Sequence, residues 1–268
     1  MLLGTMFFKF FTITMIQIKT PEEIEIMRQG GKILARVLQE LSLEVKEGVS
    51  LGYLDNLAEK LILGYGAKSS FKGYKPAGAK KAYPSALCAS LNYEVVHGVP
   101  DDRVLKNGDI ISLDLGVFYN GYHTDSAVTF GMGEISEKAT QLILVTEGAL
   151  DLAISMIKPN IYWGDIAWEM QRHVEAAKFS VVKDLTGHGV GKNLQEDPFL
   201  PNYGSKGDEP LLKEGMVLAI EPMVTIGKSA VELGLDGFVY QTKDKSLAAH
   251  FEHTVVVTKK GAEVLTKS

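Results

Sequence analysis

The sequence contains almost no cysteine. Cys88 is the single thiol among 268 residues, which rules out an internal disulfide and a zinc site built from several thiolates. A lone thiol suits a reducing compartment, so we expect a cytoplasmic protein. Any metal site in this chain must therefore be built from carboxylates and histidines.

The sequence also lacks an excess of positive charge, low-complexity segments and an obvious linker. The formal net charge is −5, so electrostatics give no reason to expect nucleic acid as a direct partner. Hydrophobic residues make up 46% and charged residues 23%, as in ordinary folded proteins. The length fits one large domain or two closely packed halves. No pattern predicts an obligate interface between copies, and we expect a monomer.

A convincing signal peptide or membrane span is missing as well. Residues 1–18 are apolar, but Lys9 interrupts them, and the run lacks a basic start, a small-residue cleavage site and the length of a typical span. We expect no association with membranes. We interpret residues 1–19 as an N-terminal tail and residues 20–268 as a single domain, and we hypothesise that Met15 is the natural start.

The spacing of apolar residues predicts helices in two pairs. Thr20, Pro21 and Glu23 supply a cap, a first-position proline and a capping box for the first helix, which runs to about Leu41. The other helices are expected at 50–64, 136–158 and 165–178, and strand-like runs at 110–118, 126–130, 217–220 and 254–258. Helix pairs that alternate with groups of strands predict an α+β or mixed α/β layer fold.

Two parts of the sequence repeat one another. Residues 105–114 and 212–221 each read as a glycine turn, an apolar strand and a terminal carboxylate. Downstream, residues 123–128 and 250–255 each place a carboxylate at the start of a β-rich run. We interpret the chain as a duplicated unit whose two pseudo-symmetric halves share one sheet. Four carboxylates would then converge at one place: Asp114, Asp125, Glu221 and Glu252.

Four buried carboxylates repel one another, and some would have to take up protons at neutral pH. Two divalent cations remove that conflict by supplying about four positive charges between them. His188 is the candidate imidazole ligand, and it would favour transition metals over magnesium or calcium. Gly187 and Gly189 on either side allow a close approach of the backbone to other groups.

In combination, these motifs resemble those of the methionine aminopeptidase family. They are Asp114 and Asp125 with ten residues between them, Gly187-His188-Gly189, Ile220-Glu221-Pro222-Met223 and Phe251-Glu252-His253-Thr254. The resemblance extends from about Thr20 to the C-terminus. It implies the family's pita-bread fold, in which an antiparallel sheet is wrapped by pseudo-symmetric helix pairs, and this agrees with the duplication.

The resemblance also implies how the metal ligands divide between two divalent cations. Asp114 would chelate one cation, while His188 and Glu221 would hold the other. Asp125 and Glu252 would bridge both. The mixture of carboxylate and imidazole donors suits cobalt, manganese, iron or zinc, and the sequence leaves the choice among them open.

The activity implied by the resemblance is removal of the N-terminal methionine from nascent proteins and peptides. A bridging metal-bound hydroxide would attack the first peptide bond. Glu221 would act as general base as well as ligand, and His97 would contact the substrate near the scissile amide. The implied partners are the N-termini of nascent polypeptides, including those emerging at the ribosome.

One position departs from the family pattern. The family usually has a second substrate-contacting histidine where this chain has Gln195, which can donate a hydrogen bond but cannot shuttle a proton. We expect activity to survive with an altered rate, pH profile or substrate range. Four residues fall where the family lines its methionine pocket: Tyr83, Cys88, Leu194 and Phe238. An apolar, aromatic and sulfur-containing pocket suits a thioether side chain.

The sequence leaves several residue roles and two alternative functions open. His123 and His250, at equivalent places in the repeat, either support the carboxylates from behind or are packing residues of strands. His253 should face away from Glu252. The basic segment 71–83 is better interpreted as a solvated loop than as a contact surface. An Xaa-Pro aminopeptidase of the same fold is the nearest alternative function, and a non-catalytic peptide-binding relative is a more distant one.

Overall fold

The computed structural model describes residues 16–76 and 80–267. Its helices are α1 (Pro21–Glu44), α2 (Leu51–Gly64), α3 (Glu137–Met156) and α4 (Trp163–Ala176). Its strands are β1 (Lys68–Ser69), β2 (Leu87–Leu91), β3 (Glu94–Val96), β4 (Ile110–Tyr119), β5 (Tyr122–Gly131), β6 (Ser180–Val181), β7 (Thr186–Gly189), β8 (Glu196–Pro201), β9 (Val217–Ile220), β10 (Met223–Thr225), β11 (Val231–Leu233), β12 (Tyr240–Thr242), β13 (Ala248–His250), β14 (Glu252–Thr258) and β15 (Gly261–Val264).

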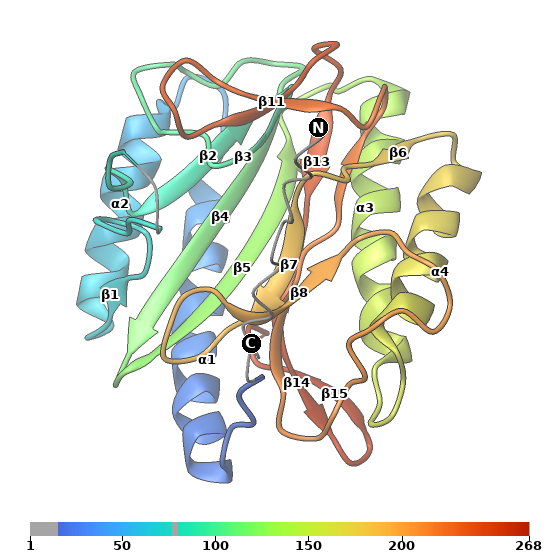
Figure 1. The fold of residues 1–268 in the computed structure, drawn as a ribbon. Helices are drawn as coiled ribbons and strands as arrows, with labels where there is room; N and C mark the ends of the chain where they lie inside the picture. The colour runs from blue at the N-terminus through green and yellow to red at the C-terminus, as the bar shows by residue number, and fades with distance from the viewer. Residues whose placement is uncertain (1–15, 77–79, 268) are drawn as a thin grey trace, which may run out of the picture.

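A nine-stranded antiparallel sheet forms the centre of the molecule (Figure 1). Its main path runs β1-β4-β5-β14-β9-β7-β8, with β2 paired to β4 and β15 paired to β14. The two long strands β4 and β5 form a hairpin, and β14 and β9 form the corresponding antiparallel pair. The α+β prediction is therefore confirmed.

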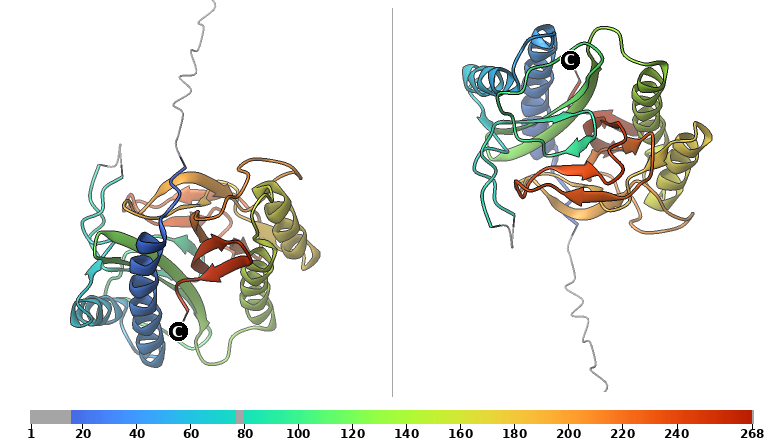
Figure 2. Two further views of the ribbon diagram at one scale, coloured as in Figure 1. Left: turned by 90° about the horizontal axis from the view of Figure 1, so that it is seen from below. Right: turned by 90° about the horizontal axis from the view of Figure 1, so that it is seen from above.

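The two halves of the chain lie on either side of the junction between β5 and β14. Helices α1 and α2 pack on the half that contains β4, whereas α3 and α4 pack on the half that contains β9 and β14, so the helix pairs flank the sheet on opposite sides (Figures 1 and 2). Each half has its own apolar core, one around Leu34 and Leu54 and the other around Trp163 and Leu218. This arrangement confirms the duplication that the repeated sequences predict.

The junction between the halves is short. Strands β5 and β14 pair at two positions only, where Glu252 lies opposite Ala127 and His253 lies opposite Ser126. The Thr254 hydroxyl strengthens this contact by accepting from the Asp125 N–H and donating to the Asp125 carbonyl, both at 2.8 Å.

The helix starts agree with the sequence where a capping signal exists. Thr20 and Glu23 form the predicted reciprocal capping box at the start of α1, and Ser50 and Ser136 cap α2 and α3. Helix α4 begins at Trp163, two residues before the predicted start. Its cap residue makes no side-chain hydrogen bond, so the sequence carries no capping signal at the true start. The prediction for this boundary is wrong by that amount.

Helix α3 is long and apolar enough to cross a membrane by length and composition alone. One face, which includes Leu142 and Leu150, is buried against the core, while Glu147 and Asp151 are exposed on the other. A core helix of a globular domain passes the same test, so this match is weak evidence for a membrane span.

The residues just before α1 are tied to the rest of the fold. The Lys19 N–H donates to the Gly215 carbonyl at 2.8 Å, and the Lys19 ammonium lies 2.5 Å from the Glu196 carboxylate. The side chains of this ion pair are only 5% and 7% exposed. Residues 1–15, which include Met15, lie outside the described residues, so the hypothesis about the natural start stays a hypothesis.

Replacing Glu196 with Gln should lower the free energy of unfolding by about 3 kcal/mol, because the Lys19 ammonium would stay buried without its counter-charge. Urea unfolding of the two proteins measures this difference. The matched control is Glu59→Gln, since Glu59 pairs with a Lys72 that is 46% exposed and should contribute less than about 1 kcal/mol. Equal losses in the two variants would contradict the prediction.

Candidate metal centre

The register of the sheet brings three of the predicted ligands to one face. Asp114 on β4 lies opposite Ala127 on β5, and Ala127 lies opposite Glu252 on β14. Asp125 precedes Ala127 by two residues, and side chains two apart on a strand point to the same face. Three carboxylates from both halves of the chain therefore meet where the halves join.

His188 and Glu221 reach the same place from the next strands. His188 on β7 lies opposite Ala219 on β9, and Glu221 follows the end of β9. The flanking glycines are required by close packing: a Cβ atom at Gly187 would lie 2.5 Å from the Ala219 carbonyl oxygen, and one at Gly189 would lie 2.3 Å from the Asp197 carbonyl oxygen. The sequence prediction of a close backbone approach on both sides of His188 is confirmed.

Hydrogen bonding fixes which nitrogen of His188 faces the carboxylates. Its Nδ1 lies 2.9 Å from the Gly189 carbonyl oxygen, which can only accept, so Nδ1 carries the proton. The lone pair of Nε2 is then available, and this atom lies 3.5 Å from Glu221 Oε1. Ligand atoms of Asp125, His188 and Glu252 all lie within 4.8 Å of one another. A neutral imidazole held in this tautomer is a typical metal ligand.

The carboxylates are buried or nearly buried, and among the described residues none of them forms an ion pair with a lysine or arginine. Burial raises the pKa of Asp114 and of Glu221 to about 7 each. For Asp125 and Glu252, burial and the neighbouring carboxylates raise the pKa well above the usual value. One oxygen of Asp114 and one of Glu252 have no hydrogen-bond partner among the described residues. Buried oxygen atoms that lack donors, next to an imidazole lone pair, fit a divalent cation.

The predicted site residues line one cavity of about 650 Å³. Those that line it are Tyr83, Cys88, His97, Asp114, Asp125, His188, Leu194, Gln195, Glu221, Phe238 and Glu252. The cavity thus has a carboxylate-rich floor and an apolar side, which are the two parts that a metal-dependent site for an apolar side chain requires.

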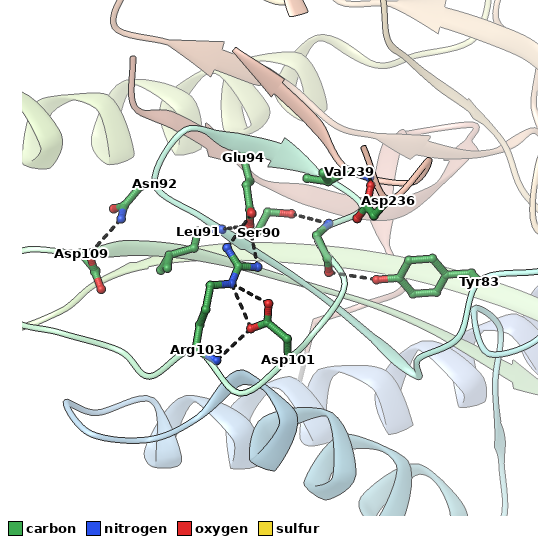
Figure 3. Close-up of polar contacts among 11 residues, drawn as sticks. Tyr83, Ser90, Leu91, Asn92, Glu94, Asp101, Arg103, Asp109, Asp236 and Val239 are labelled. Carbon is green, nitrogen blue, oxygen red and sulfur yellow. Dashed lines mark hydrogen bonds and ion pairs between the residues drawn. The ribbon is translucent and has the colours of Figure 1, made fainter. Parts of the chain in front are cut away.

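The backbone next to His97 is held by hydrogen bonds that involve Tyr83 and Ser90 (Figure 3). The hydroxyl of Tyr83 donates to the Gly98 carbonyl at 2.9 Å, and the Gly98 N–H donates to Ser90 Oγ at 3.1 Å. The residue itself has a φ of 60°, which non-glycine residues rarely adopt and which is typical of functional sites. Burial, together with nearby His250 and His188, lowers the pKa of His97 to about 4, so its ring is neutral.

The loop after His97 is anchored by an ion pair that Figure 3 also shows. Arg103 Nη1 lies 2.6 Å from the carboxylate of the nearly buried Glu94, and Glu94 accepts from the Leu91 N–H at 2.8 Å. These contacts fix the turn between β2 and β3 and the backbone that leads from β3 to His97.

The predicted pocket residues form one apolar cluster. Tyr83, Cys88, Leu194 and the partly buried Phe238 pack together with Phe71, and the rings of Tyr83 and Phe238 meet edge to face at 5.5 Å. Burial raises the pKa of the Cys88 thiol well above its usual value, so this residue behaves as an apolar side chain rather than as a nucleophile.

Several residues at the cavity leave no recognisable signal in the sequence. Phe71, Tyr74 and Tyr240 line it beside the predicted residues, and only their aromatic character could have indicated a role. The solvated-loop interpretation is incomplete, because Lys80 and Lys81 are exposed but also line the cavity.

The remaining histidines and Gln195 lie in different environments. Gln195 is exposed on the cavity wall. His123 lies 2.8 Å from Ser70 Oγ through Nδ1 and packs on a phenylalanine ring, so its packing role is supported. His253 Nδ1 contacts the Thr266 hydroxyl at 2.9 Å, as expected for a side chain that faces away from Glu252. His250, in contrast, approaches Glu221.

Comparison with known proteins agrees with this geometry. Residues 25–259 match the model of metallopeptidase family M24. The chain belongs to metallopeptidase family M24. It is 45% identical to methionine aminopeptidase 1 of Bacillus subtilis over 94% of this chain and 100% of that protein. The M24 family and the cluster of acidic and histidine ligands together support a hydrolase that depends on divalent metal.

Solved structures of similar proteins confirm the fold. A methionine aminopeptidase structure from Thermotoga maritima has a TM-score of 0.91 and 44% identity, covering 95% of this chain and 100% of that one. The prolidase from Pyrococcus furiosus has a TM-score of 0.74 and 27% identity, and the match covers 94% of this chain but 65% of the prolidase. The pita-bread fold is shared by both, and the similarity to the aminopeptidase is much greater.

The buried carboxylates should make the metal-free protein less stable as the pH rises. Between about pH 4 and pH 7 the unfolded chain has released a proton that folded Asp114 still holds, so the free energy of unfolding falls with increasing pH. Asp114→Asn removes this contribution. Without metal, the variant should melt a few degrees above wild type at pH 8 and near it at pH 4.5.

Thermal unfolding in the presence of a chelator measures this difference. Added Mn²⁺ should reverse the order at pH 8, because only the wild type keeps the full ligand set. A difference in melting temperature that stays constant from pH 4.5 to pH 8 would contradict the prediction.

Proposed function

We propose that this M24 metallopeptidase is a methionine aminopeptidase that removes the N-terminal methionine from nascent proteins and peptides. The observation that carries the proposal is the cavity itself, in which a carboxylate and histidine cluster lies beside an apolar pocket that contains aromatic rings and one sulfur. Such a pocket suits an unbranched thioether side chain. The 45% identity to a methionine aminopeptidase over its full length supports the same activity.

We propose that the site holds two divalent cations. The residues that would hold them are Asp114, Asp125, His188, Glu221 and Glu252. Four carboxylates whose pKa values burial raises can all be ionised at neutral pH if about four positive charges lie among them. The donor set suits cobalt, manganese, iron or zinc.

Bound cations of this kind polarise a carbonyl group and make water a stronger nucleophile at neutral pH. The chain's own residues would supply the rest. Glu221, whose carboxylate lies at the cavity wall, would accept a proton as general base. The neutral His97 would contact the substrate near the scissile amide. The apolar cluster around Tyr83 and Phe238 would bind the methionine side chain and exclude water from it.

The partners and location follow from the proposed activity. The substrates would be the N-termini of nascent polypeptides, including those at the ribosome, and the reaction would take place in the cytoplasm with the chain as a monomer. The single, buried Cys88 is compatible with a reducing compartment. The Xaa-Pro alternative has less support, because prolidase is less similar in both sequence and structure.

The metal-stripped protein should release methionine from a Met-Ala-Ser peptide only after a divalent cation is restored. Glu221→Gln should lower kcat at least about 100-fold, because it removes the general base and a charged ligand. Chromatography of free methionine measures both effects. Glu214→Gln, an exposed acid in the preceding turn, is the matched control and should keep full activity.

A parallel assay with an Ala-Pro-Ser peptide separates the two aminopeptidase activities. Faster hydrolysis of this peptide would favour the Xaa-Pro alternative. No hydrolysis of either peptide with cobalt, manganese, iron or zinc would contradict the enzyme and favour a peptide-binding relative.

Gln195→His should raise turnover on the methionine peptide several-fold. An imidazole at this position on the cavity wall can donate a hydrogen bond and also exchange a proton, whereas the amide can only form hydrogen bonds. Steady-state kinetics across pH 6 to 9 measure the gain. Gln195→Asn, which keeps the amide, should give no gain, and an unchanged or lower rate for Gln195→His would argue against a functional cost of the glutamine.

A further inference from the structure

His250 is a buried polar residue that the proposed reaction does not use. It ends β13, is 1% exposed, and is not among the described residues that line the cavity. Neither of its ring nitrogens has a hydrogen-bond partner among the described residues. An imidazole buried in this way is costly unless it interacts with a neighbouring group.

The backbone of His250 is fixed on both sides. Its N–H donates to Thr129 Oγ1 at 3.0 Å, and the same hydroxyl donates to the His250 carbonyl at 2.8 Å. Strand β13 pairs with β10, where His250 lies opposite Met223. These contacts fix the position of the His250 backbone, and the backbone position limits where the imidazole ring can lie.

The ring of His250 faces the carboxylate of Glu221. His250 Nε2 lies 3.6 Å from Glu221 Oε2, while His188 Nε2 lies 3.5 Å from Oε1 of the same carboxylate. The two imidazoles differ in what they can do. The Nδ1 proton of His188 is committed to a carbonyl group, so its Nε2 cannot donate when the ring is neutral. No such contact constrains His250, and its Nε2 can carry a proton and donate it in a hydrogen bond.

We propose that His250 is a positioning residue for Glu221. Its Nε2–H donates to Oε2 from behind the cavity and fixes the rotation of the carboxylate, so that Oε1 stays directed to the site of the metal ligands. A separation of 3.6 Å needs to close only slightly to reach an ordinary hydrogen bond of about 3 Å. This inference rests on the proposed role of Glu221 as metal ligand and base. Groups that orient a ligand in this way commonly affect metal affinity as well as rate.

Three substitutions of His250 test the proposal. His250→Leu removes the donor, His250→Asn keeps an amide that is too short to reach Glu221, and His250→Gln keeps a donor within reach. Calorimetric titration of the metal-stripped proteins with Mn²⁺ should show affinity about tenfold weaker for the Leu and Asn variants. The Gln variant should stay within about threefold of wild type. In the peptide assay kcat should fall in the same order, while KM changes less than about twofold.

A double-mutant cycle distinguishes positioning from a general structural effect. In a Glu221→Gln background, His250→Asn should change Mn²⁺ affinity by less than about twofold, because the interaction it removes is already altered. His123→Leu, at the equivalent place in the other half, is the matched control and should leave Mn²⁺ affinity unchanged. If the Leu variant does not fold, the Gln and Asn variants still decide the question.

Two outcomes would overturn the proposal. One is equal Mn²⁺ affinity in all His250 variants, and the other is the same loss in the wild-type and Glu221→Gln backgrounds. Failure of the wild type to release methionine would count against the proposed function instead, because Mn²⁺ titration reports the link between His250 and Glu221 without any peptide.

Discussion

The mutual repulsion of four buried carboxylates is the constraint on which this structure depends. The sheet register places Asp114, Asp125 and Glu252 on one face, and Glu221 joins them from the end of β9. Such a group of acids is unfavourable in an apolar core unless protons or cations neutralise it. Three surrounding features hold potential cation ligands at this place. Glycines allow the backbone around His188 to pack closely, Thr254 fixes the backbone of Asp125, and a hydrogen bond fixes the tautomer of the His188 imidazole.

Much of the fold could be predicted because its signals are local and repeated. A capping box, apolar periodicity and two copies of a glycine–strand–carboxylate pattern predicted the helix pairs, the main strands and the meeting of the acids. The repeat was the decisive feature, since it related carboxylates that are more than one hundred residues apart in the chain. The motifs around His188 and Glu221 indicate the family from the sequence alone.

The remainder depends on contacts that one sequence does not reveal. His123 and His250 occupy equivalent positions in the repeat, and only their neighbours show that the first packs against Ser70 while the second approaches Glu221. In the sequence, Lys19 is the last residue of the predicted tail, yet it forms a buried ion pair with Glu196, 177 residues away. Tyr74 and Tyr240 reach the cavity from loops and a short strand with no distinctive local pattern. Long-range packing decides each of these cases.

The short pairing between β5 and β14 suggests a second, structural role for the candidate metal centre. Two residue positions of backbone join the halves there, and acids from both strands face the same point. A cation held by Asp125 and Glu252 would act as a cross-link between the two halves at this short pairing. The chemistry and the cohesion of the two halves would then share one set of ligands, so selection for catalysis would also preserve the joint that keeps the duplicated units together.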